Sequence, residues 1–258
     1  MKLIENLVYQ KETGIRGLYD FYLPQDEGVP CNSLFFYIHG GGLEGGSKED
    51  IRPTLQTLAK DGIACASINY RLFGDGAVFP QFIEDCALAL HTVMTDGKKR
   101  CPYQKLFVGG SSAGAYLSMM LFCNPAYLAA YNISPYDIDG WFFDAGQPTS
   151  HFGILQRSGH HPLAVRIDET APMFYVDKPF ENPAVLPRLH FVWADRDMLC
   201  RPEQNQLMIS LLKSFGYPKE KITCECVENS AHCQYNFDAP HFAGMIKAFL
   251  QDTVPNNP

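Results

Sequence analysis

Short apolar runs alternate with helical patterns along most of this 258-residue chain, and this alternation constrains its fold more than any other feature. From residue 32 onward, six runs rich in β-branched and aromatic residues are separated by segments with helical spacing of apolar residues. This order is typical of a mostly parallel sheet covered by helices on both faces. The predicted strands are 34–38, 63–69, 105–108, 140–144, 189–194 and 222–227.

Two further strands are expected near the N-terminus. Segments 7–10 and 15–23 flank Lys11-Glu12-Thr13-Gly14, a turn signal of the kind that joins a β-hairpin. The fold class is therefore expected to be α/β, with an eight-stranded sheet that begins with antiparallel strands. The length fits one large domain over residues 1–258 better than two independent cores.

Amphipathic helices are predicted between the strands. Ser47 and Asp50 have the spacing of a capping box, so one helix is expected to begin there and to end before Gly62. A second follows Pro80, a third begins at Arg201, and a fourth lies near the C-terminus. We interpret their apolar stripes as core positions: Ile51, Leu55, Leu58 and Ala59; Phe82, Cys86, Ala89 and Val93; Leu207, Met208, Leu211, Leu212 and Phe215; Phe242, Met245, Ile246, Phe249 and Leu250.

Segment 147–187 breaks the alternation and is longer than the usual connection between a strand and a helix. We predict that it is a small cap insertion over one end of the sheet. For His151 we favour an exposed position and for Trp141 a core position over places in a binding pocket. The sequence does not indicate what His160 and His161 contact.

Composition and charge argue against several kinds of partner. The formal net charge is −7, and Lys98-Lys99-Arg100 is the longest basic cluster, so we expect no nucleic-acid partner. No apolar run approaches the ~18–20 residues that span a bilayer, so we expect no membrane segment. The N-terminus lacks a secretory pattern, and nine cysteines without framework spacing favour reduced thiols in the cytoplasm. Homo-oligomerisation is left open.

Cys224, Cys226 and Cys233 form the one cysteine cluster in the sequence. They lack a second Cys or His pair at ligand spacing, so we interpret them as buried strand thiols rather than as a zinc site. We expect neither a metal ion nor an organic cofactor.

Gly110-Ser111-Ser112-Ala113-Gly114 matches the pattern G-x-S-x-G. The match lies between a predicted strand and a helical run at 115–122, the context in which such a serine is a nucleophile. A serine on so sharp a turn takes strained backbone angles, and the glycines allow other backbone segments to approach closely. We therefore predict that Ser112 is the nucleophile.

A serine hydroxyl needs a base, and the base needs a group that orients it. Reactive groups collect at the carboxyl ends of parallel strands, so both partners are expected just after the later strands. His232 is the only histidine in the loop after the last one, and we predict that it is the base. Asp195 and Asp197 are both candidates for the acid. We favour Asp197, because Asp195 lies close enough to its strand to initiate a turn instead.

His39-Gly40-Gly41-Gly42 directly follows the predicted strand 34–38. A loop without side chains at this point allows backbone N–H groups to approach a developing oxyanion. We predict that the N–H groups of Gly41, Gly42 and Ala113 form this oxyanion hole. We interpret His39 as a structural hydrogen-bonding residue rather than a proton carrier.

The order Ser112, Asp197, His232, with the HGGG loop upstream, resembles the α/β-hydrolase family. Within that family it is most similar to the esterases and lipases with an HGGG loop, particularly compact bacterial acetylesterase-like proteins. The resemblance implies a mostly parallel eight-stranded sheet with helices on both faces, a reduced cap at 147–187, and structural roles for Arg71 and Asp85. The chain departs from the family pattern at Leu43-Glu44, where many relatives have an aromatic residue, and at Ala194, where a glycine is usual.

The predicted function is that of a serine carboxylesterase that hydrolyses small acyl esters through an acyl-enzyme. Acetyl and aryl esters on sugars are the substrates that the resemblance favours. Two alternatives stay open: an amide hydrolase of the same fold, either a formamidase or a peptidase, and a hydrolase-like protein that binds without catalysis.

Overall fold

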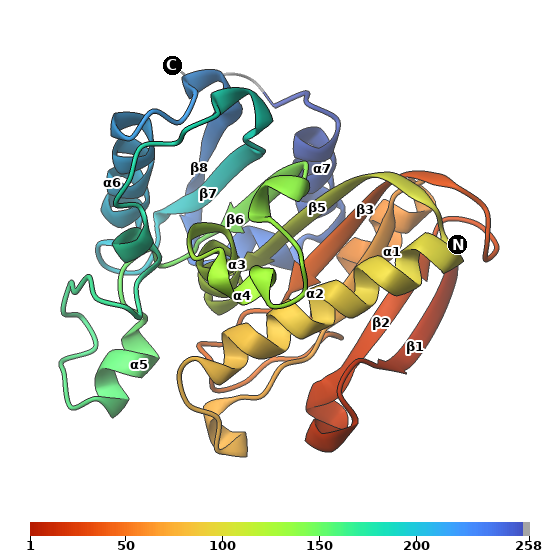
Figure 1. Ribbon diagram of the computed structural model, residues 1–258, viewed down its shortest axis with the longest axis horizontal. Helices are drawn as coiled ribbons and strands as arrows, with labels where there is room; N and C mark the ends of the chain where they lie inside the picture. Colours follow the sequence, from red (N-terminus) through yellow and green to blue (C-terminus); the bar gives the residue numbers. More distant parts are fainter. Residues whose placement is uncertain (255–258) are drawn as a thin grey trace.

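The computed structural model describes residues 1–254. Over these residues the chain forms one eight-stranded sheet in the order β1-β2-β4-β3-β5-β6-β7-β8 (Figure 1). The strands are β1 (Lys2–Val8), β2 (Leu18–Leu23), β3 (Cys31–Ile38), β4 (Ala64–Ile68), β5 (Tyr103–Ser111), β6 (Gly140–Asp144), β7 (Arg188–Arg196) and β8 (Ile222–Ala231). Antiparallel pairing joins β1 to β2 and β2 to β4, and all other neighbours are parallel. The predicted fold class is confirmed.

The N-terminal prediction is only partly right. A strand was expected at 7–10, but β1 begins at Lys2 and contains a register shift beside Asn6, whose φ is 58°. The expected tight turn is instead a 3₁₀ segment, η1 (Lys11–Gly17). The N–H groups of Tyr9 and Gln10 both donate to the carbonyl oxygen of Gly17, so this longer connection closes on itself.

Successive residues of each central strand face opposite layers of helices. Leu34, Phe36 and Ile38 of β3 belong to one buried cluster, and Phe35 and Tyr37 to the other. The first cluster is covered by α2 (Gln81–Arg100), α3 (Ala113–Cys123) and α6 (Arg201–Ser214). The second is covered by α1 (Arg52–Lys60) and α7 (Ala239–Leu250), which pack against each other. Both faces of the sheet are therefore buried, as expected of parallel strands.

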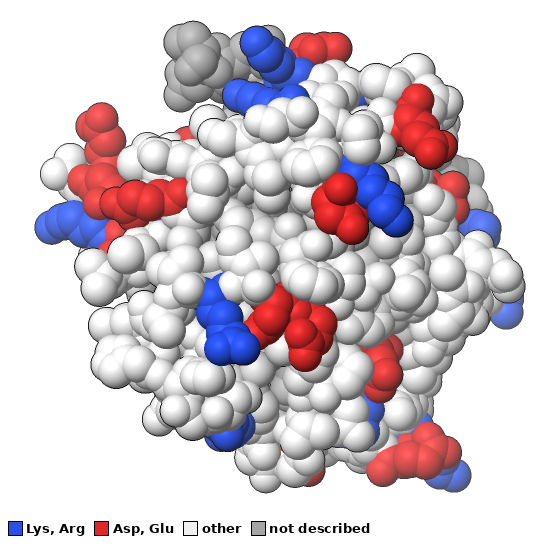
Figure 2. Space-filling model, turned by 60° about the vertical axis from the view of Figure 1, so that its left-hand side comes forward, with Lys and Arg blue, Asp and Glu red and all other residues white. Residues whose placement is uncertain are grey.

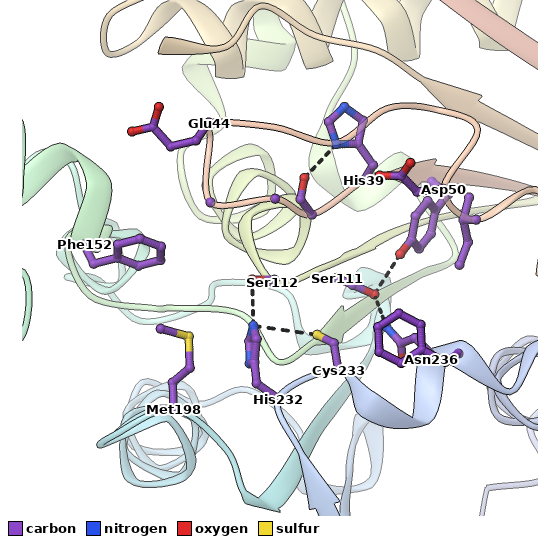
Figure 3. A pocket seen from close by; sticks show the side chains of 16 residues that line it. His39, Glu44, Asp50, Ser111, Ser112, Phe152, Met198, His232, Cys233 and Asn236 are labelled. Carbon is purple, nitrogen blue, oxygen red and sulfur yellow. Dashed lines mark hydrogen bonds between the residues drawn. The ribbon is translucent and has the colours of Figure 1, made fainter. Parts of the chain in front are cut away.

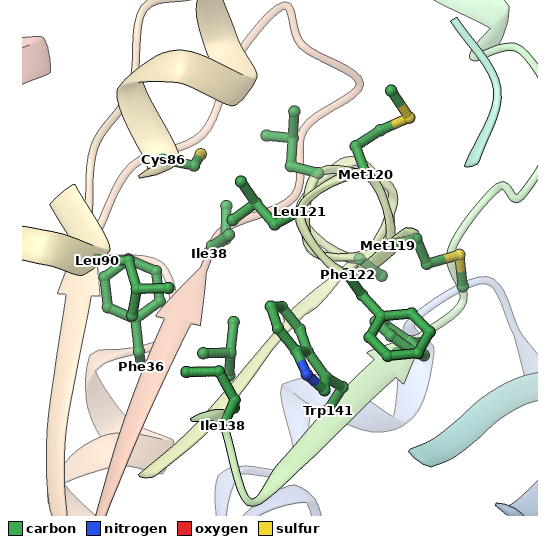
Figure 4. Packing of buried hydrophobic residues seen from close by; sticks show 14 of the residues in the cluster. Phe36, Ile38, Cys86, Leu90, Met119, Met120, Leu121, Phe122, Ile138 and Trp141 are labelled. Atoms are coloured by element: carbon green, nitrogen blue, oxygen red, sulfur yellow. The ribbon is translucent and has the colours of Figure 1, made fainter. Parts of the chain in front are cut away.

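Helix α3 lies at the centre of the first layer, and every one of its residues is buried. Its side chain Leu121 points toward Ile38 of β3, and Phe122 packs against Trp141 of β6, with ring centroids 5.7 Å apart (Figure 4). The helix begins so close to β3 that a Cβ on Gly114 would lie 2.0 Å from the carbonyl oxygen of Ile38. This contact explains why glycine is required after the serine turn.

Most predicted core stripes are buried, with some exceptions. Leu207 is 52% exposed, because it lies on the outer face of α6. Ser47 does bond to the Asp50 carboxylate through its N–H (3.0 Å) and its hydroxyl (3.1 Å), but this pair forms a separate turn and α1 begins only at Arg52. All nine cysteines are free, and Cys226 on β8 is exposed rather than buried as predicted.

Segment 147–187 contains α5 (Phe152–Arg157) and two short 3₁₀ turns, η4 (Pro172–Tyr175) and η5 (Pro183–Val185). The prediction that His151 is exposed is wrong. Its ring is buried beside Tyr116 and Phe152, and its Nδ1 accepts the N–H of Gly153. Burial lowers the pKa of His151 to about 3, so the ring stays neutral. Trp141 lies in the core, as predicted.

The surface of residues 1–254 carries both acidic and basic side chains. Within residues 1–254, no helix has both the length and the apolar character that crossing a membrane requires. On the face shown in Figure 2, basic side chains are scattered and mostly lie beside acidic ones. That face has no continuous basic patch of the kind that follows a phosphate backbone.

Candidate active site

Ser112 stands on the turn between β5 and α3 with a strained backbone. Its φ and ψ are 54° and −115°, a region that non-glycine residues rarely occupy. The turn is held by the burial of α3 on one side and by a hydrogen bond from the Ser112 N–H to the carbonyl oxygen of Asp144 (2.7 Å) on the other. The geometry predicted for Ser112 from the G-x-S-x-G pattern is present.

The structure brings Ser112, His232 and Asp197 together in series (Figure 3). His232 Nε2 lies 2.8 Å from Ser112 Oγ, and His232 Nδ1 lies 2.5 Å from Asp197 Oδ1. The three side chains come from the turn after β5, the connection after β7 and the residue after β8. Because Asp197 accepts at Nδ1, the proton is held there and the Nε2 lone pair faces the serine hydroxyl.

The side chain of Asp197 is buried, yet it favours its charged form. Burial opposes ionisation, but hydrogen bonds from His232 and from the N–H groups of Met198 (2.6 Å) and Ala194 (3.2 Å) outweigh it, so the pKa of Asp197 lies below its usual value. An ionised carboxylate at this position can stabilise a positive imidazole.

Asp195, the other candidate acid, points elsewhere. Its carboxylate accepts the N–H groups of Asn229 and Ser230, both at 2.9 Å, and so connects β7 to β8. Both strands are longer than predicted: β7 continues to Arg196 and β8 to Ala231, so the expected loop before His232 is largely strand.

The segment after β3 passes directly over the serine turn. A Cβ on Gly40 would lie 3.4 Å from Ser112 Cβ, and Gly41 and Gly42 have φ values of 103° and 65°. In the described part of the chain, the N–H groups of Gly41 and Gly42 donate to no protein acceptor. The N–H of Ala113 belongs to the first turn of α3 and has no partner within that helix. All three predicted oxyanion donors are therefore free to bind a ligand.

His39 supports this loop from behind. Its ring is buried and stacks on Tyr70 at 4.3 Å, and its Nδ1 donates to the carbonyl oxygen of Gly40 (2.7 Å). Burial lowers the pKa of His39 to about 4. A ring that stays neutral and bonds to the loop backbone agrees with the structural interpretation.

A cavity of about 590 Å³ opens above Ser112 and His232. Phe152 and Met198 line one side, and Asp50 and Asn236 line the other (Figure 3). Tyr37 also lines the cavity. The remaining lining residues are His39, Gly40, Gly41, Gly42, Glu44, Ile51, Ser111, Cys233 and Phe237. The charged side chains that line it are therefore the carboxylates of Glu44 and Asp50, with no lysine or arginine among them.

Sequence reasoning missed a polar network beneath this cavity. Tyr37 donates to Ser111 Oγ (2.7 Å), and Asn236 Nδ2 donates to both Ser111 Oγ (3.0 Å) and Asp144 Oδ2 (2.7 Å). The hydroxyls of Ser111 and Tyr235 also donate to Asp144. Asp144 ends a predicted parallel strand, so the reasoning that found Asp197 at a strand end also applies to it.

Comparisons with known proteins agree with this architecture. The family model described as BD-FAE matches residues 19–127, a part of the chain that contains the HGGG loop and Ser112. A comparison with curated proteins finds no match.

Solved structures of esterases are similar over almost the whole chain. An inhibited esterase B from Lactobacillus rhamnosis has a TM-score of 0.76 at 16% identity, with 98% of this chain and 85% of that chain covered. The apo form of esterase 2 from Thermogutta terrifontis has a TM-score of 0.76 at 19% identity, covering 98% and 96%. A truncated carbohydrate esterase from gut microbiota has a TM-score of 0.71 at 19% identity, covering 98% and 96%. Together with the sheet order and the serine turn, these similarities show that the chain has the α/β-hydrolase fold.

Proposed function

We propose that the protein is a serine carboxylesterase that hydrolyses small acyl esters. The observation that carries the proposal is the 2.8 Å contact between His232 Nε2 and Ser112 Oγ, with Asp197 on the other ring nitrogen. A nucleophile, a base and an orienting acid in this arrangement activate a serine for acyl transfer. The esterases among the similar structures favour an ester as the substrate.

In the acylation step, Ser112 Oγ bonds to the ester carbonyl carbon as its proton passes to His232 Nε2. The electron pair of the carbonyl double bond moves onto the oxygen, which the N–H groups of Gly41, Gly42 and Ala113 bind. Each such donor contributes about 2.7–4 kcal/mol to lowering the barrier. When the oxyanion collapses, the bond to the alcohol breaks and the imidazolium gives its proton to the leaving oxygen.

In the deacylation step, water adds to the acyl carbonyl while His232 takes one of its protons. The second tetrahedral species then releases the carboxylic acid, and Ser112 recovers its proton from His232. Asp197 forms no bond to substrate in either step. It holds the proton on Nδ1 and stabilises the positive charge that the ring acquires twice in each cycle.

The cavity favours uncharged substrates of moderate size. Its volume of about 590 Å³ exceeds that of a simple acetyl ester, and Phe152, Met198 and Phe237 provide apolar walls. No lysine or arginine lines the cavity to attract a negatively charged substrate; the charged lining residues are Asp50 and Glu44, and Glu44 is paired with Arg157. Acetyl or aryl esters on sugars meet these requirements, and the similarity to a carbohydrate esterase favours them further.

A fluorophosphonate probe and a substrate panel test the proposal. The probe is expected to label the wild-type protein and not Ser112→Ala, and p-nitrophenyl acetate is expected to be hydrolysed faster than an N-formyl aromatic amine or an aminoacyl anilide. Cleavage of an amide alone would identify a formamidase or peptidase instead. Absence of both labelling and turnover would identify a binding protein. Esters of increasing acyl length and acetylated or feruloylated sugars then define the substrate.

Gly41→Ala is expected to lower kcat for p-nitrophenyl acetate about 10²- to 10³-fold, the usual cost of losing an oxyanion donor. The φ of Gly41 is 103°, and a Cβ there would lie 2.2 Å from the carbonyl oxygen of Gly45, so the loop and its N–H groups must move. Gly45→Ala is the matched control, because a Cβ at that position meets nothing within 4 Å. Equal activities for the two variants would exclude Gly41 from the oxyanion hole.

A further inference from the structure

Asp144 links the two chain segments that carry the nucleophile and the base. It is the last residue of β6, and its side chain is completely buried. One of its partners, Ser111, directly precedes Ser112, and the other two, Tyr235 and Asn236, follow shortly after His232. A single carboxylate therefore holds both segments beneath the cavity.

The directions of the hydrogen bonds show whether the network suits an ionised or a protonated Asp144. The Asn236 amide nitrogen can only donate, and it donates to Ser111 Oγ and to Asp144 Oδ2. Ser111 Oγ also accepts from Tyr37, so its own proton is directed to Asp144 Oδ2, while Tyr235 donates to Oδ1. Since every partner donates, the arrangement is that of an ionised carboxylate.

This anion has no cationic partner within the described residues. Arg201 of α6 lies near the end of β6, but its guanidinium donates to the carbonyl oxygen of Ala145 and to the Gln147 side chain, not to Asp144. Burial raises the pKa of Asp144, and the hydrogen bonds from Ser111, Tyr235 and Asn236 oppose that rise.

Among the titratable groups around Asp144, one gains positive charge during the proposed reaction. These groups are Tyr37 on β3, and Cys233, Tyr235 and His232 after β8. Asp197 binds the other ring nitrogen of His232, Arg201 binds the carbonyl oxygen of Ala145, and Asp50 is near Tyr37. The tyrosines and Cys233 stay neutral, because burial raises the pKa of each. His232 takes the proton of Ser112 and becomes an imidazolium in each half of the cycle.

We propose that Asp144 is a positioning residue with an electrostatic effect. Its carboxylate fixes the nucleophile turn against the segment that carries His232, and its negative charge stabilises the imidazolium in addition to Asp197. Asp144 exchanges no proton and forms no bond to substrate, since the Ser112 proton moves to Nε2 and from there to the leaving alcohol. The inference rests on the proposed esterase function.

Two variants separate the charge of Asp144 from its hydrogen bonds. Asp144→Asn removes the charge and keeps the shape, whereas Ser111→Ala removes the three hydrogen bonds of the Ser111 hydroxyl, one of them to Asp144, and keeps the charge. For Asp144→Asn we expect kcat for p-nitrophenyl acetate to fall about 10- to 100-fold with little change in KM, because a transition-state interaction is lost. The acid limb of the kcat/KM profile should also move to lower pH, because an imidazole with one anion fewer nearby is harder to protonate. Ser111→Ala should lower kcat less and leave the acid limb in place.

The outcomes distinguish this inference from the proposed function. A wild-type protein without esterase activity would overturn both. An active wild type, together with an Asp144→Asn protein whose acid limb does not move, would overturn the role of Asp144 alone. Circular dichroism and thermal unfolding check each variant, and Asp144→Ser, which leaves room for water at the freed donors, replaces Asp144→Asn if that variant does not fold. If neither neutral variant folds, Asp144 is a structural residue and the proposal is wrong.

Discussion

Asp197→Asn is expected to lower kcat/KM for p-nitrophenyl acetate about 10⁴-fold, the cost of this change in the serine-protease triad. The amide of an asparagine can donate to His232 Nδ1, which places the ring proton on Nε2 and removes the lone pair that faces Ser112. The side chains have nearly the same shape, and the N–H of Ala194 keeps its oxygen acceptor, whereas the amide nitrogen that replaces Oδ1 no longer accepts the N–H of Met198. The loss of one backbone hydrogen bond leaves the fold in place. The far-ultraviolet circular dichroism spectrum should therefore be unchanged, while steady-state kinetics show the loss.

Asp195→Asn is the matched control for this experiment. Asp195 is two residues away, and its oxygens bind the N–H groups of Asn229 and Ser230 instead of the histidine. An asparagine keeps one acceptor oxygen there, so activity should stay close to that of the wild type. If Asp195→Asn loses activity and Asp197→Asn retains it, the acid has been assigned to the wrong residue.

Lys48→Met is expected to lower the free energy of unfolding by about 3–5 kcal/mol, because it leaves a buried carboxylate without its main partner. Lys48 and Asp20 are 1% and 0% exposed, and Lys48 Nζ lies 2.7 Å from Asp20 Oδ1. Arg52, at 3.1 Å from the other carboxylate oxygen, compensates for only part of the loss. Urea unfolding measures the change.

Two further variants identify the ion pair as the cause. The double variant Asp20→Asn with Lys48→Met removes both charges and should recover part of the lost stability. Lys11→Met at an exposed position should change the free energy of unfolding by no more than about 0.5 kcal/mol. A double variant as unstable as Lys48→Met would show that the cost comes from lost packing of the lysine stem.

The sequence was most informative where the chain is fully buried. The parallel strands β3 to β7 contain short stretches of buried, mostly apolar residues, such as Leu34–Ile38 within β3, and a strand is predicted at each of them. The strand ends were harder to predict, because β7 and β8 continue into polar residues, where the Asp195 carboxylate accepts the N–H groups of Asn229 and Ser230. The start of β1 was missed for a related reason: this edge strand is half exposed and bulged, so its pattern of alternation is weak.

In the candidate site, too, the residues with a local sequence pattern were the ones that could be predicted. Ser112 could be predicted because its turn requires glycines at fixed positions, and His232 because it follows the last strand of the sheet. The Asp144 network has no such local pattern, since Ser111 and Asn236 are 125 residues apart and meet only in the fold. His151 was misplaced because a histidine in a long irregular segment carries no sequence signal for burial.

The proposed catalytic residues and the wall of the cavity belong to different parts of the fold. Ser112, Asp197 and His232 follow the carboxyl ends of the parallel strands β5, β7 and β8, whereas Phe152 belongs to α5 within the irregular segment 147–187. Mutations in that segment can reshape the wall without displacing the groups that move the proton. Substitution of Phe152 is therefore the natural first step toward changing which esters the proposed enzyme accepts.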